Sequence, residues 1–284
     1  MHIFIQNTTN TSTTKSEAPA IITSNKKVSF SYGINKYPDP RNNLQGCVND
    51  AKDWADLLTN IYGFKNTLKF DKEVTYSAVY EILGNMIADA KSGDKLVLTG
   101  SSHGTSVTDK GGDDIDGKDE AVCLYDNIML DDTFRSIIAK MVDGVSLTII
   151  SDSCFSGSVT REFLSSMSEP KYMKPRYMPP EDCVEANLVI SLPKKMTREI
   201  FPEENMREVL ISGCSDNQYS YDAYIGGSYR GAMSYYATKV IRANPTQTYA
   251  QFYANLRKNL PSSNYSQTPQ LESSSANKNK PLFT

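Results

Sequence analysis

The sequence predicts an α/β fold in which a mostly parallel β-sheet is covered by helices on both faces. From Lys27 onward, short runs rich in β-branched and aromatic residues alternate with stretches of helical periodicity. The run 145–150 is almost continuously apolar, as is typical of a strand buried on both faces of a parallel sheet. Strand–helix alternation of this kind indicates layered α/β architecture. A chain of 284 residues with 39% hydrophobic residues is long enough to bury a sizeable core.

The individual elements follow from local patterns. Thr75 is a residue type that caps helices, and the apolar residues after it recur every three or four positions as far as Ala90. The same spacing runs from Leu44 to Leu58, whereas residues 105–119 are rich in Gly and Asp and predict a loop. We expect strands at 28–32, 67–70, 95–99, 121–125 and 145–150, and helices at 44–58, 75–90 and 134–142.

Two segments lack such patterns. Residues 1–25 are polar and of low complexity, which predicts a disordered leader. Residues 26–284 predict a single domain, within which the segment 161–206 loses all periodicity and reads as a linker. The second half of the domain, 207–284, is expected to hold a strand at 208–212, a polar loop to Tyr229, helices at 231–242 and 246–259, and a polar tail.

Composition narrows the class of function. A formal charge of −3 argues against nucleic acid or an anionic membrane as a partner. No apolar run approaches the length of a transmembrane helix, and Met1–Gln6 lacks the character of a secretory signal. We therefore expect a cytoplasmic protein whose five cysteines are free thiols. The chain has only two histidines, and His103 is the one outside the leader.

His103 and Cys154 each follow a predicted buried strand. Sites in open α/β sheets form at the carboxyl ends of strands, so two adjacent strands would bring these residues together. A thiolate nucleophile needs a nearby base, and glycines at 104 and 157 would leave backbone N–H groups accessible to an oxyanion. The pattern favours a cysteine peptidase. The structural alternative is a buried thiol and a loop histidine satisfied by hydrogen bonds.

The sequence around both residues resembles the metacaspases, a family of caspase-like cysteine peptidases. Asp-Ser-Cys-Phe-Ser-Gly at 152–157 resembles their catalytic-cysteine motif, and Ser-Ser-His-Gly at 101–104 resembles their histidine motif. Four further segments also resemble the family: 32–37, 44–51, 210–218 and 267–270. The resemblance thus extends over about 27–272, with its motifs in the order that the family has them. It implies a caspase-like fold with a large-subunit-like region at 26–160 and a small-subunit-like region at 207–284.

The resemblance also implies roles for single residues. Cys154 would be the nucleophile and His103 the general acid and base, while the backbone N–H groups of Cys154 and Gly104 would form the oxyanion hole. The family motif has Gly where this chain has Ser102, a change that costs backbone freedom only if φ is positive there. We expect the reaction to survive this departure.

The implied substrate is a protein or peptide with Arg or Lys before the scissile bond. The family's pocket for that side chain maps onto Cys47, Asp50, Ser101 and Asp152. Two carboxylates hold a basic side chain through charge-assisted hydrogen bonds and repel an acidic one, so the mapping makes physical sense. The structural alternative for Asp50 is stabilisation of a helix start.

Many metacaspases are activated by Ca²⁺, and the implied ligands here are Asp119, Asp131 and Asp132. The fourth carboxylate of the family site would fall at Arg161, so Glu162 would have to replace it. Capping of a helix is the structural alternative for Asp131 and Asp132. The acidic stretch 113–120 fails as an EF-hand, because alignment on Gly117 leaves no carboxylate at either end of the loop.

The linker carries basic residues that an Arg/Lys-specific peptidase would cut, which predicts a self-processing zymogen. They are Lys171, Lys174, Arg176, Lys194, Lys195 and Arg198. The short linker resembles that of minimal type I or bacterial-type metacaspases. Metacaspases are usually monomers, so the resemblance implies a monomer. A pseudoprotease that serves as a binding or scaffold module remains the alternative. A serine hydrolase is disfavoured because no G-x-S-x-G elbow occurs near Ser151, Ser153 or Ser156.

Overall fold

Six strands form the central sheet in the order β12-β9-β7-β3-β1-β2. In this computed structural model, the described residues are 24–108, 118–154, 173–183, 203–215 and 218–284. The pairs among β2, β1, β3, β7 and β9 are parallel and only β12 is antiparallel. This confirms the predicted parallel sheet. The strands are β1 Lys27–Gly33, β2 Lys65–Phe70, β3 Lys95–Ser101, β7 Ser146–Asp152, β9 Val209–Ser212 and β12 Gln270–Glu272.

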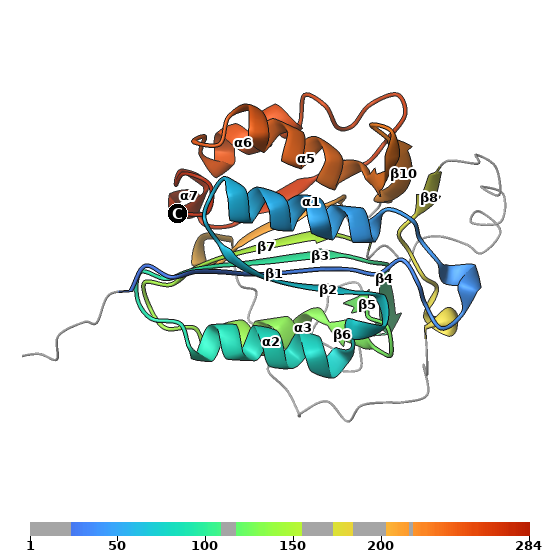
Figure 1. The fold of residues 1–284 in the computed structure, drawn as a ribbon, viewed down its shortest axis with the longest axis horizontal. Helices are drawn as coiled ribbons and strands as arrows, with labels where there is room; N and C mark the ends of the chain where they lie inside the picture. Colours follow the sequence, from blue (N-terminus) through green and yellow to red (C-terminus); the bar gives the residue numbers. More distant parts are fainter. Residues whose placement is uncertain (1–23, 109–117, 155–172, 184–202, 216–217) are drawn as a thin grey trace, which may run out of the picture.

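Helices cover both faces of the sheet, with α1, α5 and α6 on one side and α2 and α3 on the other (Figure 1). Thr75 caps α2 by accepting a hydrogen bond from the backbone N–H of Ala78, as its position predicts. A last, short helix, α7, lies near the C-terminus. The bounds are α1 Cys47–Asn60, α2 Tyr76–Ala88, α3 Asp131–Ile138, α5 Ala232–Ala243, α6 Tyr249–Leu256 and α7 Ser275–Lys278. No helix of the described residues is long and apolar enough to cross a bilayer.

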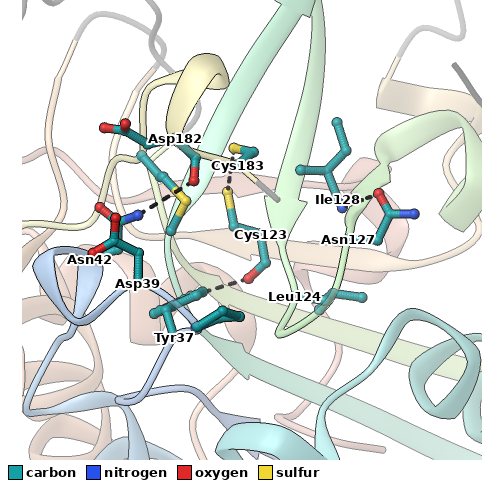
Figure 2. A pocket seen from close by; sticks show the side chains of 11 residues that line it. Tyr37, Asp39, Asn42, Cys123, Leu124, Asn127, Ile128, Asp182 and Cys183 are labelled. Carbon is teal, nitrogen blue, oxygen red and sulfur yellow. Dashed lines mark hydrogen bonds between the residues drawn. The ribbon is translucent and has the colours of Figure 1, made fainter. Parts of the chain in front are cut away.

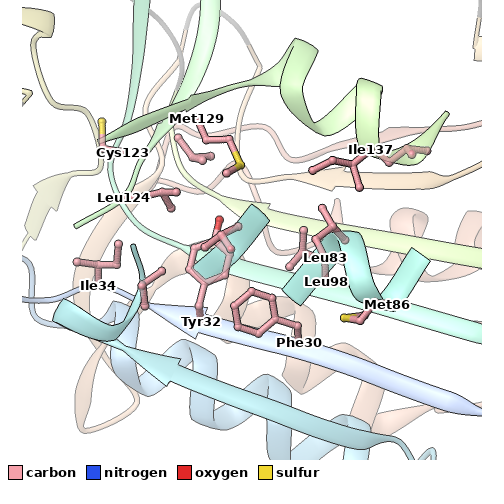
Figure 3. Close-up of a cluster of buried hydrophobic side chains, with 14 of the residues drawn as sticks. Phe30, Tyr32, Ile34, Leu83, Met86, Leu98, Cys123, Leu124, Met129 and Ile137 are labelled. Carbon is pink, nitrogen blue, oxygen red and sulfur yellow. The ribbon is translucent and has the colours of Figure 1, made fainter. Parts of the chain in front are cut away.

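The alternating side chains of β3 supply both apolar layers. Leu96 and Leu98 belong to the cluster beneath α2 and α3, whereas Val97 belongs to the cluster beneath α1, α5 and α6. The first cluster, which includes Phe30 and Leu83, is drawn in Figure 3. Burial on both faces explains why β3 has three consecutive apolar residues at 96–98.

Two three-stranded sheets extend the structure beyond the central sheet, in the orders β4-β5-β6 and β11-β10-β8. The prediction of loops was wrong for parts of these sheets. β4 lies almost entirely within the predicted Gly/Asp-rich loop and β8 within the predicted linker. β10 lies within the predicted polar loop, and β11 begins there. Their bounds are β4 Gly104–Thr108, β5 Lys118–Cys123, β6 Ile128–Leu130, β8 Met173–Pro175, β10 Tyr221–Ile225 and β11 Ser228–Gly231.

Four short 3₁₀ helices complete the described elements: η1 Pro40–Asn42, η2 Asp71–Glu73, η3 Pro180–Asp182 and η4 Glu203–Asn205. η3 follows β8 closely, so the described part of the predicted linker, 173–183, is an ordered strand and turn. The polar tail also contains structure, because β12 and α7 lie within it. The predicted disordered leader falls almost entirely outside the described residues.

Candidate active site

The ends of β3 and β7 place His103 and Cys154 at one edge of the central sheet. Ser101 is paired with Asp152 in the parallel register, so the two residues that follow each strand leave the sheet at the same level. The hydroxyl oxygens of Ser102 and Ser153 lie 3.3 Å apart and join these two strand ends. His103 is 1% exposed and Cys154 is completely buried. The structure thus brings the predicted pair to one buried site.

The contacts of the His103 ring show which of its two nitrogens carries the hydrogen. Its Nε2 lies 2.8 Å from the carbonyl oxygen of Asn42, which can only accept, so Nε2 carries the hydrogen. Nδ1 is then the free base, and it has no hydrogen-bond partner among the described residues. The hydroxyl of Tyr37 accepts a hydrogen bond of 3.0 Å from the backbone N–H of His103 and helps to hold the residue.

The His103 imidazole is neutral in this state. Burial lowers its pKa to about 3, and the nearby Lys174 cation acts in the same direction. The carbonyl groups of Asn42 and Arg176 oppose this effect only in part. A neutral imidazole with an unoccupied Nδ1 has the form that a general base requires.

The thiol of Cys154 is held by the backbone of Ser220. Sγ lies 3.3 Å from the Ser220 carbonyl oxygen, to which it donates, and it accepts from the Ser220 N–H. The side chain packs in a small cluster with Tyr177, Cys214 and Tyr219. The thiol is therefore fixed in place and buried in this state.

Two backbone N–H groups converge on one carbonyl oxygen. The N–H groups of Gly104 and Cys154 donate to the carbonyl oxygen of Arg176, at 2.9 and 3.2 Å. They are the same two groups that the sequence predicts as the oxyanion hole. An oxygen held by two amide donors is stabilised further when it gains negative charge.

The side chain of Arg176 fills the predicted specificity pocket. Its Nη2 lies 2.6 Å from Asp50 Oδ2 and 3.1 Å from Asp222 Oδ1, and its Nη1 lies 3.3 Å from Asp152 Oδ2. Nη1 also donates to the Asp152 backbone carbonyl at 3.0 Å. The guanidinium and all three carboxylates are buried. A guanidinium is thus held by three carboxylates, two of which the sequence predicts.

Asp222 is the pocket residue that sequence reasoning missed. It lies in β10, within the stretch predicted as a polar loop, and its carboxylate also accepts from the backbone N–H groups of Gln45 and Gly46 at 2.7 and 2.8 Å. A single acidic residue between Tyr221 and Ala223 in a β-rich run is a signal that could have found it.

The other predicted pocket residues, Cys47 and Ser101, are also buried here. The Arg176 charge lies close enough to the Cys47 thiol to favour its thiolate, although burial raises the thiol pKa well above its usual range. Gly231 closes the pocket: a Cβ there would lie 2.1 Å from Asp152 Oδ2 and 2.5 Å from Arg176 Nη1. Only a residue without a side chain leaves room for the guanidinium.

Asp50 is the carboxyl group most strongly perturbed by the pocket. Burial raises its pKa to about 7, although the Arg176 guanidinium acts in the opposite direction. The neighbouring Asp152 carboxylate adds to the increase by like-charge repulsion. The two carboxyl oxygens of Asp50 accept from the backbone N–H of Gly231 at 2.9 and 3.0 Å. With three carboxylates around one cation, the pocket has an excess of negative charge.

The backbone around Arg176 crosses the site as an extended peptide. β8 pairs antiparallel with β10, and the Arg176 N–H donates to the Ser220 carbonyl at 2.9 Å. On the other side, the Met178 N–H donates to the Gly104 carbonyl at 2.9 Å. The peptide bond between Arg176 and Tyr177 therefore lies between the two flanking sets of hydrogen bonds, with its carbonyl oxygen at the two N–H donors.

The described residues do not by themselves build a calcium site. Asp131 forms a 2.7 Å ion pair with Arg135 and accepts from the Asp132 backbone N–H, both at the start of α3. Asp119 lies in β5 and is buried. Within the described ranges, no three His, Cys, Asp or Glu side chains come together as a metal site. Glu162 and Arg161 lie outside the described residues.

Comparison with known proteins places this site in a family. The caspase domain family matches residues 31–281. Metacaspase-1 of Schizosaccharomyces pombe is 30% identical over 88% of this chain and 67% of its own length. Metacaspase-1 of Saccharomyces cerevisiae is 31% identical over 85% of this chain and 65% of its own length.

Two solved structures are similar to this one. A protein from Geobacter sulfurreducens superposes with a TM-score of 0.72 at 27% identity and covers 91% of this chain and 98% of that one. Caspase-1 from Spodoptera frugiperda has a TM-score of 0.54 at 10% identity over 94% of each chain, a likeness in fold alone. The chain therefore belongs to the caspase-domain family, in which its likeness to the metacaspases identifies it as a metacaspase-like cysteine peptidase.

Proposed function

We propose that the protein is an endopeptidase that cleaves after arginine, and less well after lysine, through Cys154 and His103. The observation that carries this proposal is Arg176, whose guanidinium contacts three buried carboxylates while its carbonyl oxygen contacts the two N–H donors. A substrate arginine in the same position would place its scissile carbonyl oxygen at the N–H groups of Gly104 and Cys154, which would stabilise the oxyanion.

The reaction follows from the groups at that position. His103 Nδ1 takes the thiol proton, and the Cys154 thiolate attacks the scissile carbonyl carbon. The developing oxyanion is stabilised by the N–H groups of Gly104 and Cys154. His103 then gives the proton to the leaving amine as the C–N bond breaks, and water hydrolyses the thioester.

Arginine fits the pocket better than lysine because its two terminal nitrogens have different partners. Nη2 contacts Asp50 and Asp222, whereas Nη1 contacts Asp152. A single ammonium nitrogen on a shorter side chain cannot reach both groups in the same way. An acidic side chain would meet three carboxylates and is excluded by like-charge repulsion.

A panel of matched peptides that differ only in the residue before the scissile bond tests this specificity. We expect kcat/KM for Arg to exceed that for Lys by about tenfold, the worth of one charge-assisted hydrogen bond, and no cleavage after Asp. Cys154→Ala is the control and should cleave none of them. Equal cleavage after Asp, or activity of Cys154→Ala, would contradict the proposal.

We further propose that Arg176–Tyr177 is a self-processing site and that the intact chain is a zymogen. The segment 173–178 has the hydrogen bonds expected of a bound substrate, so it excludes any other peptide from the pocket. Of the two predicted cleavage residues that the structure describes, Lys174 and Arg176, Arg176 is the one whose side chain is fully buried against carboxylates. Self-cleavage would free the pocket for other substrates.

A scaffold role without catalysis is the competing function. A peptide that carries arginine next to a cysteine-reactive group distinguishes the two, because it should label Cys154 of a peptidase once the pocket is free. Binding of the peptide without any covalent label on Cys154 would favour the scaffold.

A further inference from the structure

A second pair of reactive groups lies outside the site described above. The Sγ atoms of Cys123 and Cys183 are 3.7 Å apart, with Cys123 at the end of β5 and Cys183 directly after η3 (Figure 2). Both side chains are buried, with exposed fractions of 2% and 8%. Residues 60 positions apart in the sequence thus have their thiols in contact.

The two cysteines belong to two different parts of the structure around the active site. Cys183 ends the described segment 173–183, here named the occluding segment because it contains Arg176. Cys123 is tied to the catalytic loop: its N–H donates to the His103 carbonyl at 2.8 Å, and its carbonyl accepts from the Tyr37 hydroxyl at 3.2 Å. A bond between the two sulfurs would join the occluding segment to the frame of the active site.

The pair is chemically asymmetric. The Cys123 thiol hydrogen-bonds to Cys183 and lowers the pKa of that thiol, while burial raises the pKa of Cys123 well above its usual range. Cys183 is therefore the more reactive thiolate and Cys123 the resolving thiol. Both residues line a small pocket together with Asp39 and Asn127 (Figure 2).

We propose that Cys123 and Cys183 form a reversible disulfide under peroxide that locks the occluding segment in the active site. Hydrogen peroxide oxidises the Cys183 thiol to a sulfenic acid and is itself reduced to water. The Cys123 thiol then attacks the Cys183 sulfur, the S–O bond breaks, and a second water leaves as the disulfide forms. Two thiols and one peroxide thus give one disulfide and two waters, and a thiol reductant reverses the bond.

The geometry requires only a small movement. A disulfide has an S–S distance of about 2.05 Å, so the sulfurs must approach by less than about 2 Å from their present contact. Seven positions separate Arg176 from Cys183, so the bond would keep the arginine at high effective concentration beside its pocket. The regulatory consequence depends on the proposed peptidase function, whereas formation of the bond does not.

The first test uses Cys154→Ala protein, which cannot cut itself. After treatment with hydrogen peroxide, peptide mapping without reductant should find the Cys123–Cys183 disulfide, and dithiothreitol should remove it. Limited trypsin digestion should cut the Arg176–Tyr177 bond about tenfold more slowly in the oxidised protein, because the tether keeps Arg176 in its pocket. Cys183→Ser in the same background should abolish both effects.

The second test uses protein with Cys154 intact that is oxidised before it has cut the Arg176–Tyr177 bond, because after that cut Cys183 lies on the fragment without Arg176. Peroxide should lower its cleavage of an arginine peptide about tenfold more than that of matched Cys183→Ser protein, with recovery in dithiothreitol. Comparison of the two proteins separates this effect from oxidation of Cys154, which both share. Absence of the mapped disulfide, or equal trypsin rates with and without it, would overturn the proposal. An inactive reduced protein would instead contradict the peptidase function and leave the trypsin result valid.

Discussion

Arg176 and its three carboxylates are the residues on which the proposed selectivity for arginine rests. Asp50 and Asp152 could be predicted because both lie in segments with a recognisable pattern. Asp222 was missed, because the one acidic residue between Tyr221 and Ala223 is a weak signal and the strand itself is clear only once β10 pairs with β8 and β11. Arg176 could be predicted as a cleavable residue, but its place in the pocket depends on tertiary contacts.

Removal of the third carboxylate should weaken arginine recognition. Asp222→Asn takes one charged partner from Nη2, so we expect kcat/KM for arginine peptides to fall about tenfold, equivalent to roughly 1.5 kcal/mol. Steady-state kinetics with the arginine peptide measure this. Asp53→Asn is a matched control, because Asp53 pairs with Arg230 outside the pocket. An unchanged kcat/KM in Asp222→Asn would show that this contact does not contribute.

The pKa of Asp50 predicts how stability depends on pH. Its pKa is raised from 3.8 to about 7 in the folded chain, so the protonated carboxyl stabilises the fold. This contribution is complete below pH 4 and is lost as the pH rises to 7. In the Cys154→Ala background, Asp50→Asn should therefore remove a downward slope in the free energy of unfolding between pH 5 and 7, on the order of one kcal/mol or more.

Denaturant unfolding of both proteins at several pH values measures this slope. Arg176, Asp152 and Asp222 are the charged groups that face Asp50 in the pocket, and all three are unchanged in the variant. Parallel curves for the two proteins would mean that Asp50 is ionised throughout this range in the folded chain.

At the scale of elements, the predictable strands and helices are those with a sustained local pattern. α2 buries four apolar residues after the capping Thr75, and β7 has Leu147, Ile149 and Ile150 in its middle. β8, with three residues, is extended because it pairs with β10, and no periodicity can be read from so short a run. The prediction of an unstructured linker therefore failed at the segment that fills the active site.

Calcium activation stays a prediction that concerns the start of α3. If Asp131 and Asp132 bind Ca²⁺ with residues outside the described ranges, a chelator should lower peptidase activity and added Ca²⁺ should restore it. Asp132→Asn should reduce that response several-fold, whereas Asp143→Asn, on a surface ion pair with Arg207, should not. Equal activity in chelator and in Ca²⁺ would rule out calcium activation.

The active site lies at one edge of the central sheet and is built from segments that are distant in the sequence. His103 and Cys154 come from the first half of the domain. From the second half, β10 supplies Asp222, and Ser220, directly before β10, contacts the Cys154 thiol. The occluding segment runs between them and completes both the pocket and the β10 sheet. The mostly parallel sheet could be expected from the sequence, but the occupied state of the site could not, because it depends on how three separate segments meet.

We propose above all that Cys154 cleaves the Arg176–Tyr177 bond of its own chain. Incubation of the purified protein, followed by N-terminal sequencing of its fragments, tests this most directly. We predict a fragment that begins at Tyr177 from the protein with Cys154 intact, and none from Cys154→Ala or Arg176→Ala. An intact bond after incubation, or the same fragment from Cys154→Ala, would contradict the account.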